Sequence, residues 1–271
     1  SDGIDWSSPF PAQSVTISNT APVVSDVHLT PESATSSDDL EISVNYSDLD
    51  GDVEATPSIR WYRDGQLQTQ FTDNLVISSS ATNRGEVWMA RYTPNDGTSV
   101  GLEVESSSVT IGNSMATISS ISLTENATAL SPLDLILGGL PYDEDNDQIA
   151  LNIQWMRDGF HVSALDNLTS VPTEWLGVGQ SWTASLELYD GFEGSPRITS
   201  ENVVIVNLMP TAAFTVGDTV LVEAITEFDA SLSIDLDGQI VAWFWTVGTT
   251  SYSGEVISLI LTDPNTVVNL T

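Results

Sequence analysis

Short runs in which apolar and polar residues alternate recur along the chain. Residues 40–46, 58–62 and 87–92 place an apolar side chain at every second position. This period of two predicts β-strands that turn one face toward a core. The dipeptide Asp64-Gly65 follows one of these runs and is typical of the tight turn in a β-hairpin. Because no segment keeps a helical period, the pattern predicts an all-β protein.

The pattern returns after an interval of 94 residues. Trp61 and Trp88 are matched at this interval by Trp155 and Trp182. The sequence WYRDG, which begins at Trp61, returns as WMRDG from Trp155, and a second Asp-Gly dipeptide agrees at the same interval. Chance does not easily place so many matches at one interval, so the sequence predicts a tandem repeat.

The interval also sets the predicted limits of each repeat. Residues 20–113 and 114–207 are expected to form two complete repeats, and 208–271 a third unit that stops short of full length. Residues 1–19 match the end of a repeat and are expected to form the C-terminal hairpin of a preceding, truncated unit. These limits predict a fragment of a longer array in which each repeat is one structural unit.

Repeat length and strand content together indicate the fold. A unit of 94 residues with roughly seven short strands and one tryptophan in a central strand is typical of an immunoglobulin-like β-sandwich. We expect Trp61 and Trp155 in the core on strand C, and Trp88 and Trp182 on strand F. For the second pair, packing between the sheets is favoured over an exposed platform for a ligand. The chain has no cysteine, so these cores have no disulfide.

The third unit carries a recognisable signature. Residues 210–214 read PTAAF, and residues 228–245 read FDASLSIDLDGQIVAWFW. This signature resembles the polycystic kidney disease (PKD) domain, an immunoglobulin-like β-sandwich common in secreted and cell-surface proteins. The family usually continues with an acidic turn, where this chain has TVGTT at 246–250. The resemblance covers roughly 208–271 and implies PKD-like sandwiches, of which the first two units are more divergent relatives.

An Asp-rich loop follows a strand in each unit. Its acidic residues are Asp48, Asp50 and Asp52 in the first unit, Asp143, Asp145 and Asp147 in the second, and Asp235 and Asp237 in the third. Alternate aspartates in a tight loop turn their carboxylates toward a common point, and Ca²⁺ takes six to eight oxygen ligands. We predict that these eight residues bind Ca²⁺, with backbone carbonyls, water or a neighbouring unit completing the ligands. The alternative is a solvated Asp/Gly turn.

The charge of the chain excludes several classes of partner. It has 38 acidic residues against 6 basic ones, and its formal net charge is −32. Binding to nucleic acid or to an anionic membrane depends on lysine and arginine, so neither is expected. No apolar run approaches the length of a membrane span, so no membrane insertion is expected in this segment.

The sequence offers little that resembles an active site. Its two histidines, His28 and His161, have no counterpart in the other repeats, and no nucleophile or phosphate-binding motif is present. The carboxylates recur in every repeat, which is typical of structure or of repeated binding. We therefore predict a protein that is not an enzyme.

Three functional readings remain open. The first is a structural or adhesive segment of a large extracellular or cell-surface protein, forming a rod stiffened by Ca²⁺, with neighbouring repeats, other surface proteins or polysaccharide as partners. The second is an accessory module of a secreted hydrolase that binds carbohydrate or protein through exposed aromatics such as Trp175, Phe192 and Phe244. The third is a subunit of a surface layer or filament in which sandwiches pair edge to edge.

Overall fold

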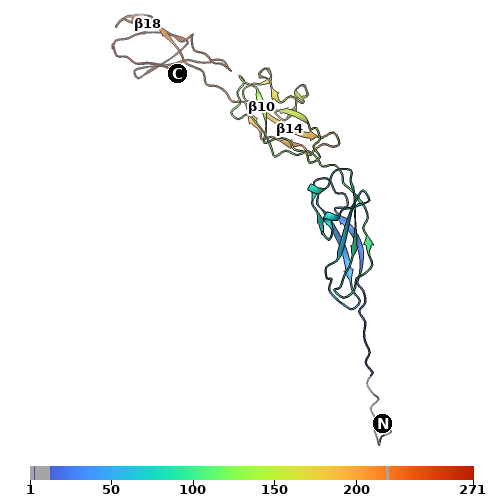
Figure 1. Ribbon diagram of the computed structural model, residues 1–271. Coiled ribbons are helices and arrows are strands. Elements are labelled where there is room, and N and C mark those ends of the chain that lie inside the picture. The colour runs from blue at the N-terminus through green and yellow to red at the C-terminus, as the bar shows by residue number, and fades with distance from the viewer. Residues whose placement is uncertain (1–2, 4–12, 218–219) are drawn as a thin grey trace. The chain divides into compact units, whose positions relative to one another are not determined.

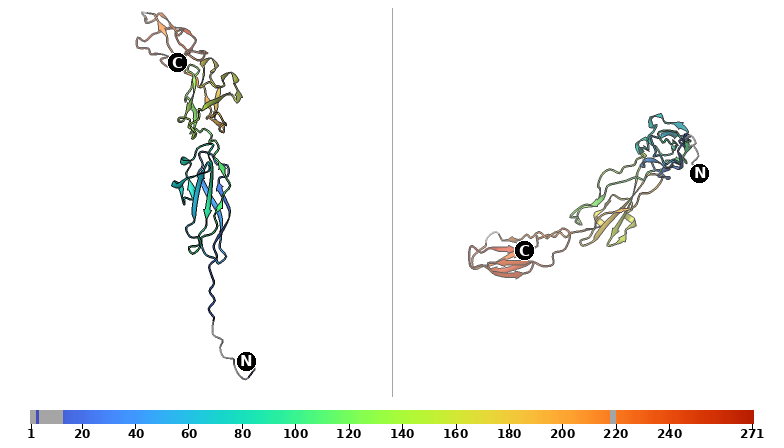
Figure 2. Two further views of the ribbon diagram at one scale, coloured as in Figure 1. Left: turned by 45° about the vertical axis from the view of Figure 1, so that its right-hand side comes forward. Right: turned by 90° about the horizontal axis from the view of Figure 1, so that it is seen from below.

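The chain is built from β-strands. The computed structural model describes residues 3, 13–217 and 220–271, and within these ranges it contains strands, four 3-10 turns and no α-helix (Figure 1, Figure 2). None of the described residues belongs to a helix long and apolar enough to cross a membrane. The chain divides into two compact units. One holds the described residues up to Ser114 together with Asp143–Asp147, and the other holds Met115–Tyr142 and Gln148–Thr271.

The first sandwich packs a small sheet against a larger one. The small sheet has the order β1-β2-β5 and the larger one β4-β3-β6-β7, with β8 also paired to β6, and all pairs are antiparallel. The strands are β1 (Val23–Thr30), β2 (Leu40–Ser47), β3 (Ser58–Arg63), β4 (Gln66–Leu67), β5 (Val76–Ile77), β6 (Val87–Thr93), β7 (Val104–Glu105) and β8 (Val109–Thr110). The 3-10 turns are η1 (Thr69–Phe71) and η2 (Ser79–Ala81).

The second sandwich repeats this order. Its sheets are β9-β10-β13 and β12-β11-β14-β15, with β16 also paired to β14. The strands are β9 (Ile121–Leu123), β10 (Leu133–Leu137), β11 (Ala150–Arg157), β12 (Phe160–His161), β13 (Ser170–Val171), β14 (Ser181–Tyr189), β15 (Ile198–Thr199) and β16 (Val203–Val204). Its 3-10 turns are η3 (Ser163–Leu165) and η4 (Thr173–Trp175), which lie 94 residues after η1 and η2.

The third sandwich has two three-stranded sheets among the described residues. Their orders are β17-β18-β21 and β20-β19-β22. The strands are β17 (Thr215–Val216), β18 (Ile225–Asp229), β19 (Phe244–Val247), β20 (Thr250–Ser253), β21 (Val256–Ile260) and β22 (Val268–Leu270). The prediction of tandem immunoglobulin-like sandwiches is therefore confirmed, whereas the limits of the individual repeats stay predictions.

Each sandwich has its own hydrophobic core. Trp61 and Trp155, on the strands that take the place of strand C, are fully buried, as predicted. Trp88 and Trp182, on the strands that take the place of strand F, are also fully buried. Their predicted role in packing is confirmed, because a buried indole offers no platform to a ligand. In the third core the buried tryptophan is Trp245.

Turn chemistry explains where the central hairpins reverse. Asp64 and Gly65 join β3 to β4 with φ values of 49° and 75°, and Asp158 and Gly159 join β11 to β12 with 51° and 81°. Two successive positive φ angles are what a type I′ hairpin turn requires. The predicted Asp-Gly turns are thus present at both places.

The interval of 94 residues does not hold in every strand. Leu40 pairs with Ile77, and its counterpart Leu133 pairs with Val171. The two leucines lie 93 residues apart and both are fully buried. The hairpin predicted for 1–19 falls largely outside the described residues, and the residues of this segment that are described, 3 and 13–19, belong to no strand.

Candidate metal sites in the Asp-rich loops

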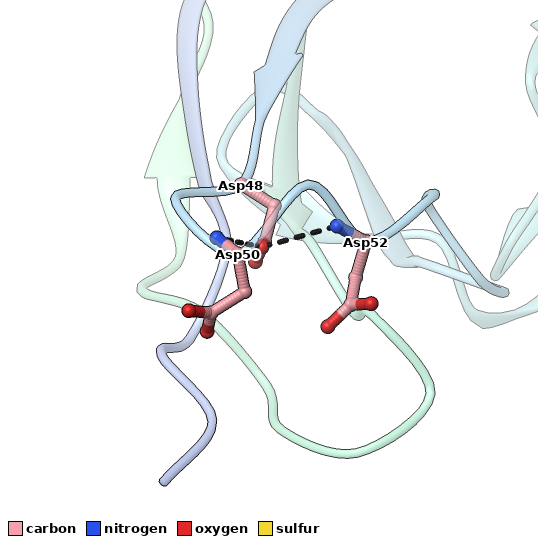
Figure 3. A group of neighbouring side chains, drawn as sticks. All are labelled: Asp48, Asp50 and Asp52. Carbon is pink, nitrogen blue, oxygen red and sulfur yellow. Dashed lines mark hydrogen bonds between the residues drawn. The ribbon is translucent and has the colours of Figure 1, made fainter. Parts of the chain in front are cut away.

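The loop between β2 and β3 gathers three carboxylates. Asp48 accepts two backbone N–H bonds at Oδ1, from Asp50 at 2.8 Å and from Asp52 at 3.3 Å. Gly51 adopts a φ of 84°, which lets the chain reverse between them. Figure 3 shows the Asp48 carboxylate between these two nitrogens, with the other two carboxylates on one side of the loop. One carboxylate oxygen of each aspartate lies within 4.8 Å of the others.

The second loop repeats this geometry in a more buried setting. Asp143 accepts the backbone N–H of Asp147 at Oδ1, at 3.0 Å, and Asn146 takes the place of Gly51 with a φ of 61°. Asp143, Asp145 and Asp147 again bring one oxygen each within 4.8 Å of the others. Asp143 is only 5% exposed.

Two oxygens in these loops lack partners. Asp48 Oδ2 and Asp143 Oδ2 are both buried and accept no hydrogen bond. A buried carboxylate oxygen without a donor is costly, and a bound cation would satisfy it. The donor sets, three carboxylates in each loop, are of the kind that Ca²⁺ prefers. The residues of the first two loops therefore fit a hard divalent cation.

The third loop is smaller. The backbone N–H of Asp237 donates to Asp235 Oδ1 at 3.2 Å. A Cβ at Gly238 would come within 2.8 Å of Asp235 Oδ2, so any larger residue here would displace the Asp235 carboxylate from its present position. Among the described residues, these two predicted ligands belong to no group of three acidic side chains.

The second aspartate of every loop, hereafter the central aspartate, binds the segment that enters its sandwich. In each case its carboxylate accepts the backbone N–H of a residue about thirty positions earlier. The pairs are Asp50 with Thr20 at 2.6 Å, Asp145 with Ser114 at 2.9 Å, and Asp237 with Leu208 at 3.0 Å. Because the three donors lie at successive intervals of 94 residues, this contact is part of the repeat. Sequence reasoning missed it, since a backbone donor leaves no residue signature.

The loop between β6 and β7 also binds the segment that enters the first sandwich. Asn19 donates through Nδ2 to Asp96 Oδ2 at 2.8 Å and to Ser99 Oγ at 2.9 Å. This hydrogen bond from Asn19, followed by the backbone N–H of Ser99, lowers the pKa of Asp96 below its ordinary value. Residues 19 and 20 are thus fixed by carboxylates from two loops.

The tyrosine beside the first loop lies among acidic side chains. The Tyr46 hydroxyl donates to the backbone carbonyl of Asp52 at 3.4 Å. Burial, followed by the nearby charges of Asp48, Asp96 and Glu54, raises the pKa of Tyr46. These charges show a local excess of negative potential that a bound cation would reduce.

Arg84 lies beside the second loop, within the same compact unit. It pairs with both oxygens of Asp147, of which Nη2 to Oδ1 measures 3.1 Å, and Nη1 lies 3.7 Å from Asp145 Oδ2. The same Nη1 donates to Asn113 Oδ1 at 2.5 Å. The hydrogen bond to Asp147 raises the pKa of this arginine. A polar cavity of about 280 Å³ adjoins it, lined in part by Ser36.

The remaining candidates fall into two groups. Trp175 is half-buried and packs against the second core, whereas Phe192 and Phe244 are 61% and 59% exposed. His28 lies 3.4 Å from Asp26, and His161 lies 2.7 Å from Asp166. Neither histidine joins an Asp-rich loop group among the described residues.

Comparison with known proteins gives structural likeness only. No protein-family model matches the chain, and no curated protein matches it. The FN1–FN3 domains of chicken CNTN1 align at a TM-score of 0.28 and 9% identity, covering 92% of this chain and 90% of that one. A two-domain fibronectin type III segment from chicken tenascin aligns at 0.34 and 9%, covering 67% and 98%.

Immunoglobulin domains 1–5 of Sidekick-1 align at a TM-score of 0.32 and 12% identity, covering 94% of this chain and 59% of that one. Because these TM-scores lie below 0.5, the likeness carries no argument about function. The assignment to immunoglobulin-like sandwiches rests on the strand orders and the cores of this chain.

Proposed function

We propose that this chain is a non-catalytic, extracellular structural or adhesive repeat segment whose Asp-rich loops bind Ca²⁺ and restrain the linkers between sandwiches. The observation that carries the proposal is the recurring hydrogen bond from a linker N–H to the central aspartate, as from Thr20 to Asp50 at 2.6 Å. A catalytic group is normally unique in a chain, whereas this contact occurs in all three repeats.

The cation has a defined task in this proposal. Asp48, Asp50 and Asp52 would hold it in the first loop, and Asp143, Asp145 and Asp147 in the second. A bound divalent cation offsets the repulsion between three carboxylates and satisfies the buried oxygens. Since the central aspartate also accepts the linker N–H, ordering the loop orders the linker. Ca²⁺ would in this way stiffen the array.

The expected partners and location of the chain follow from its composition and from the resemblance of its third unit. A net charge of −32 keeps a chain of sandwiches soluble and apart from nucleic acid. Neighbouring repeats of the same chain are the first expected partners, with other surface proteins or polysaccharide as further ones. The resemblance of residues 208–271 to the PKD domain is kept as part of this proposal, and it favours an extracellular or cell-surface location.

Calorimetry and scattering test the proposal together. Adding millimolar Ca²⁺ at matched ionic strength is expected to raise the Tm and to narrow the range of interdomain distances in small-angle X-ray scattering. The D50N variant keeps an oxygen for the Thr20 N–H but loses one charge, so its response to Ca²⁺ is expected to weaken. A matched control is D134N on β10, which lies outside the Asp-rich loops. A wild-type chain whose Tm does not respond to Ca²⁺ would rule the cation out.

An accessory binding module is the second candidate. It is favoured by two aromatic side chains that remain well exposed, Phe192 at 61% and Phe244 at 59%. Exposed aromatic rings of this kind can stack on sugars or insert into a protein partner. Pull-down with insoluble polysaccharides tests it. Retention that is lost in the F192A or F244A variant would favour the module over the spacer.

A further inference from the structure

The two Asp-rich groups of the first compact unit differ in the charge beside them. Among the residues that the structure describes, Asp48, Asp50 and Asp52 form no ion pair. Arg84, which lies beside the second loop, binds both carboxylate oxygens of Asp147 in that loop. The guanidinium therefore supplies to the second loop a positive charge that the first loop lacks.

A separate observation shows that Arg84 does not complete the second loop. Asp143 is 5% exposed, and its Oδ2 accepts no hydrogen bond from any neighbour. The side chain of Asp145 is also 5% exposed, and one of its oxygens lies within 4.8 Å of the Asp143 and Asp147 ligand atoms. A buried, unpartnered carboxylate oxygen in such a group points to a cation that the arginine does not replace.

We propose that Arg84 and a divalent cation compete for Asp147, so that Arg84 sets the cation affinity of the second loop. This inference rests on the proposed function, in which the loops bind Ca²⁺. A cation held by Asp143, Asp145 and Asp147 has to share the last carboxylate with two guanidinium N–H donors. The two positive charges repel each other, and the ion pair must break before the carboxylate can turn fully to the cation.

The arginine has an alternative partner when it leaves Asp147. Its Nη1 already donates to Asn113 Oδ1 at 2.5 Å, in the linker that follows the first sandwich. Cation binding thus exchanges an arginine contact for a metal contact while Arg84 stays bound to the linker. At the interval of 94 residues the counterpart of Arg84 is Val178, so the loop of the third repeat has no equivalent competitor.

Calorimetric titration of CaCl₂ into the full chain tests the competition. The D50N and D237N substitutions together leave the second loop as the intact Asp-rich loop. In that background R84Q is expected to bind Ca²⁺ about tenfold more tightly, and R84K to fall between the two. R197Q is the matched control, because it removes the same charge from an arginine paired with Glu187 at 3.0 Å and should leave the affinity unchanged.

A second readout does not depend on the stability of the variants. The chain has only six basic residues, all arginine, so their side-chain Nε signals can be followed by NMR. In the D50N/D237N chain, Ca²⁺ is expected to shift the Arg84 signal as the Asp147 contact breaks. An unmoved Arg84 signal at saturating Ca²⁺ overturns the proposal.

The outcomes separate this inference from the function on which it rests. Equal or weaker Ca²⁺ affinity in R84Q overturns the competition alone, since the loop has still bound the cation. No binding in either the D50N/D237N chain or its R84Q derivative also overturns the competition. The proposed function fails with it only if the wild-type chain, with all loops intact, also shows no response to Ca²⁺.

Discussion

Trp61 lies edge-on against Trp88 in the core of the first sandwich, with ring centroids 6.4 Å apart and an interplanar angle of 69°. Trp155 and Trp182 repeat the arrangement in the second core at 6.4 Å and 75°. Trp61 also donates its indole N–H to the carbonyl oxygen of Asn74 at 2.9 Å. Trp155 donates in the same way to the carbonyl oxygen of Leu168 at 2.9 Å, so in a chain without cysteine this aromatic pair and its hydrogen bond anchor the centre of each of the first two sandwiches.

Truncating Trp61 is therefore expected to unfold one sandwich selectively. W61A should destabilise the first sandwich by about 3–5 kcal/mol, because it leaves a large cavity and an unpaired carbonyl. Hydrogen exchange followed by mass spectrometry reports each sandwich separately and avoids assuming one transition for the whole chain. W175A is the control. Because Trp175 is only half-buried, its truncation should destabilise the second sandwich by less than about 2 kcal/mol. Equal loss of protection in both sandwiches would contradict the prediction.

The fold was largely predictable because its signals are periodic. Alternating residues predicted the strands, and the spacing of Trp61 and Trp155 predicted two equivalent cores. The interval was not uniform, however: Leu40 and Leu133 lie 93 residues apart, although their pairing partners Ile77 and Val171 keep 94. A shift of one residue turns the opposite face of a strand inward, so only the observed pairing fixes this register.

The left-handed backbone at one position in each of the first two Asp-rich loops leads to a further prediction. Gly51 and Asn146 occupy equivalent positions with φ values of 84° and 61°. Alanine tolerates this region poorly, so G51A and N146A should each cost about 1 kcal/mol, whereas N146G should change stability by less than about 0.5 kcal/mol. Urea unfolding monitored by hydrogen exchange measures each. G217A is the control, because that glycine avoids the left-handed region and has nothing within 4 Å of a Cβ. An N146A variant with unchanged stability would contradict the left-handed backbone conformation at this position.

The Asn19–Asp96 contact predicts a pH dependence with a defined sign. The pKa of Asp96 is lowered in the folded chain, first by the hydrogen bond from Asn19. Its contribution to stability is thus fully present above the ordinary carboxyl value of 3.8 and is lost as the pH falls through the lower folded value. NMR titration of the Asp96 carboxyl carbon should give a pKa below 3.8. N19A should raise it, and an unchanged value would exclude Asn19 as the cause.

The candidate site was predicted only in part. The recurrence of aspartates identified the loops, and the structure places Asp48, Asp50 and Asp52 together as expected. The contact between Arg84 and Asp147 joins residues 63 positions apart that belong to different predicted repeats. No periodic pattern marks such a pair, since Arg84 has no counterpart in the next repeat. Long-range pairing of single residues is what self-comparison of a sequence cannot detect.

The hydrogen bond from Thr20 to Asp50 gives the most direct test of linker restraint. At 2.6 Å to an ionised acceptor, it is of the stronger class of hydrogen bond. In D50A the Thr20 amide loses its acceptor, so its hydrogen exchange should accelerate by about 10- to 100-fold, which corresponds to roughly 1.5–3 kcal/mol. D50N should have a smaller effect, because the amide oxygen still accepts. NMR-detected exchange in the presence of a chelator measures this without any cation.

D52A is the matched control for this experiment. Asp52 belongs to the same loop and carries the same charge, but its carboxylate accepts no bond from the linker among the described residues. Removing it should leave the exchange of the Thr20 amide unchanged, whereas a general loosening of the loop would accelerate exchange in both variants. Equal exchange in wild type and D50A would mean that the loop does not hold the linker. The restraint of the linker would then have to come from Asn19 and Asp96 alone.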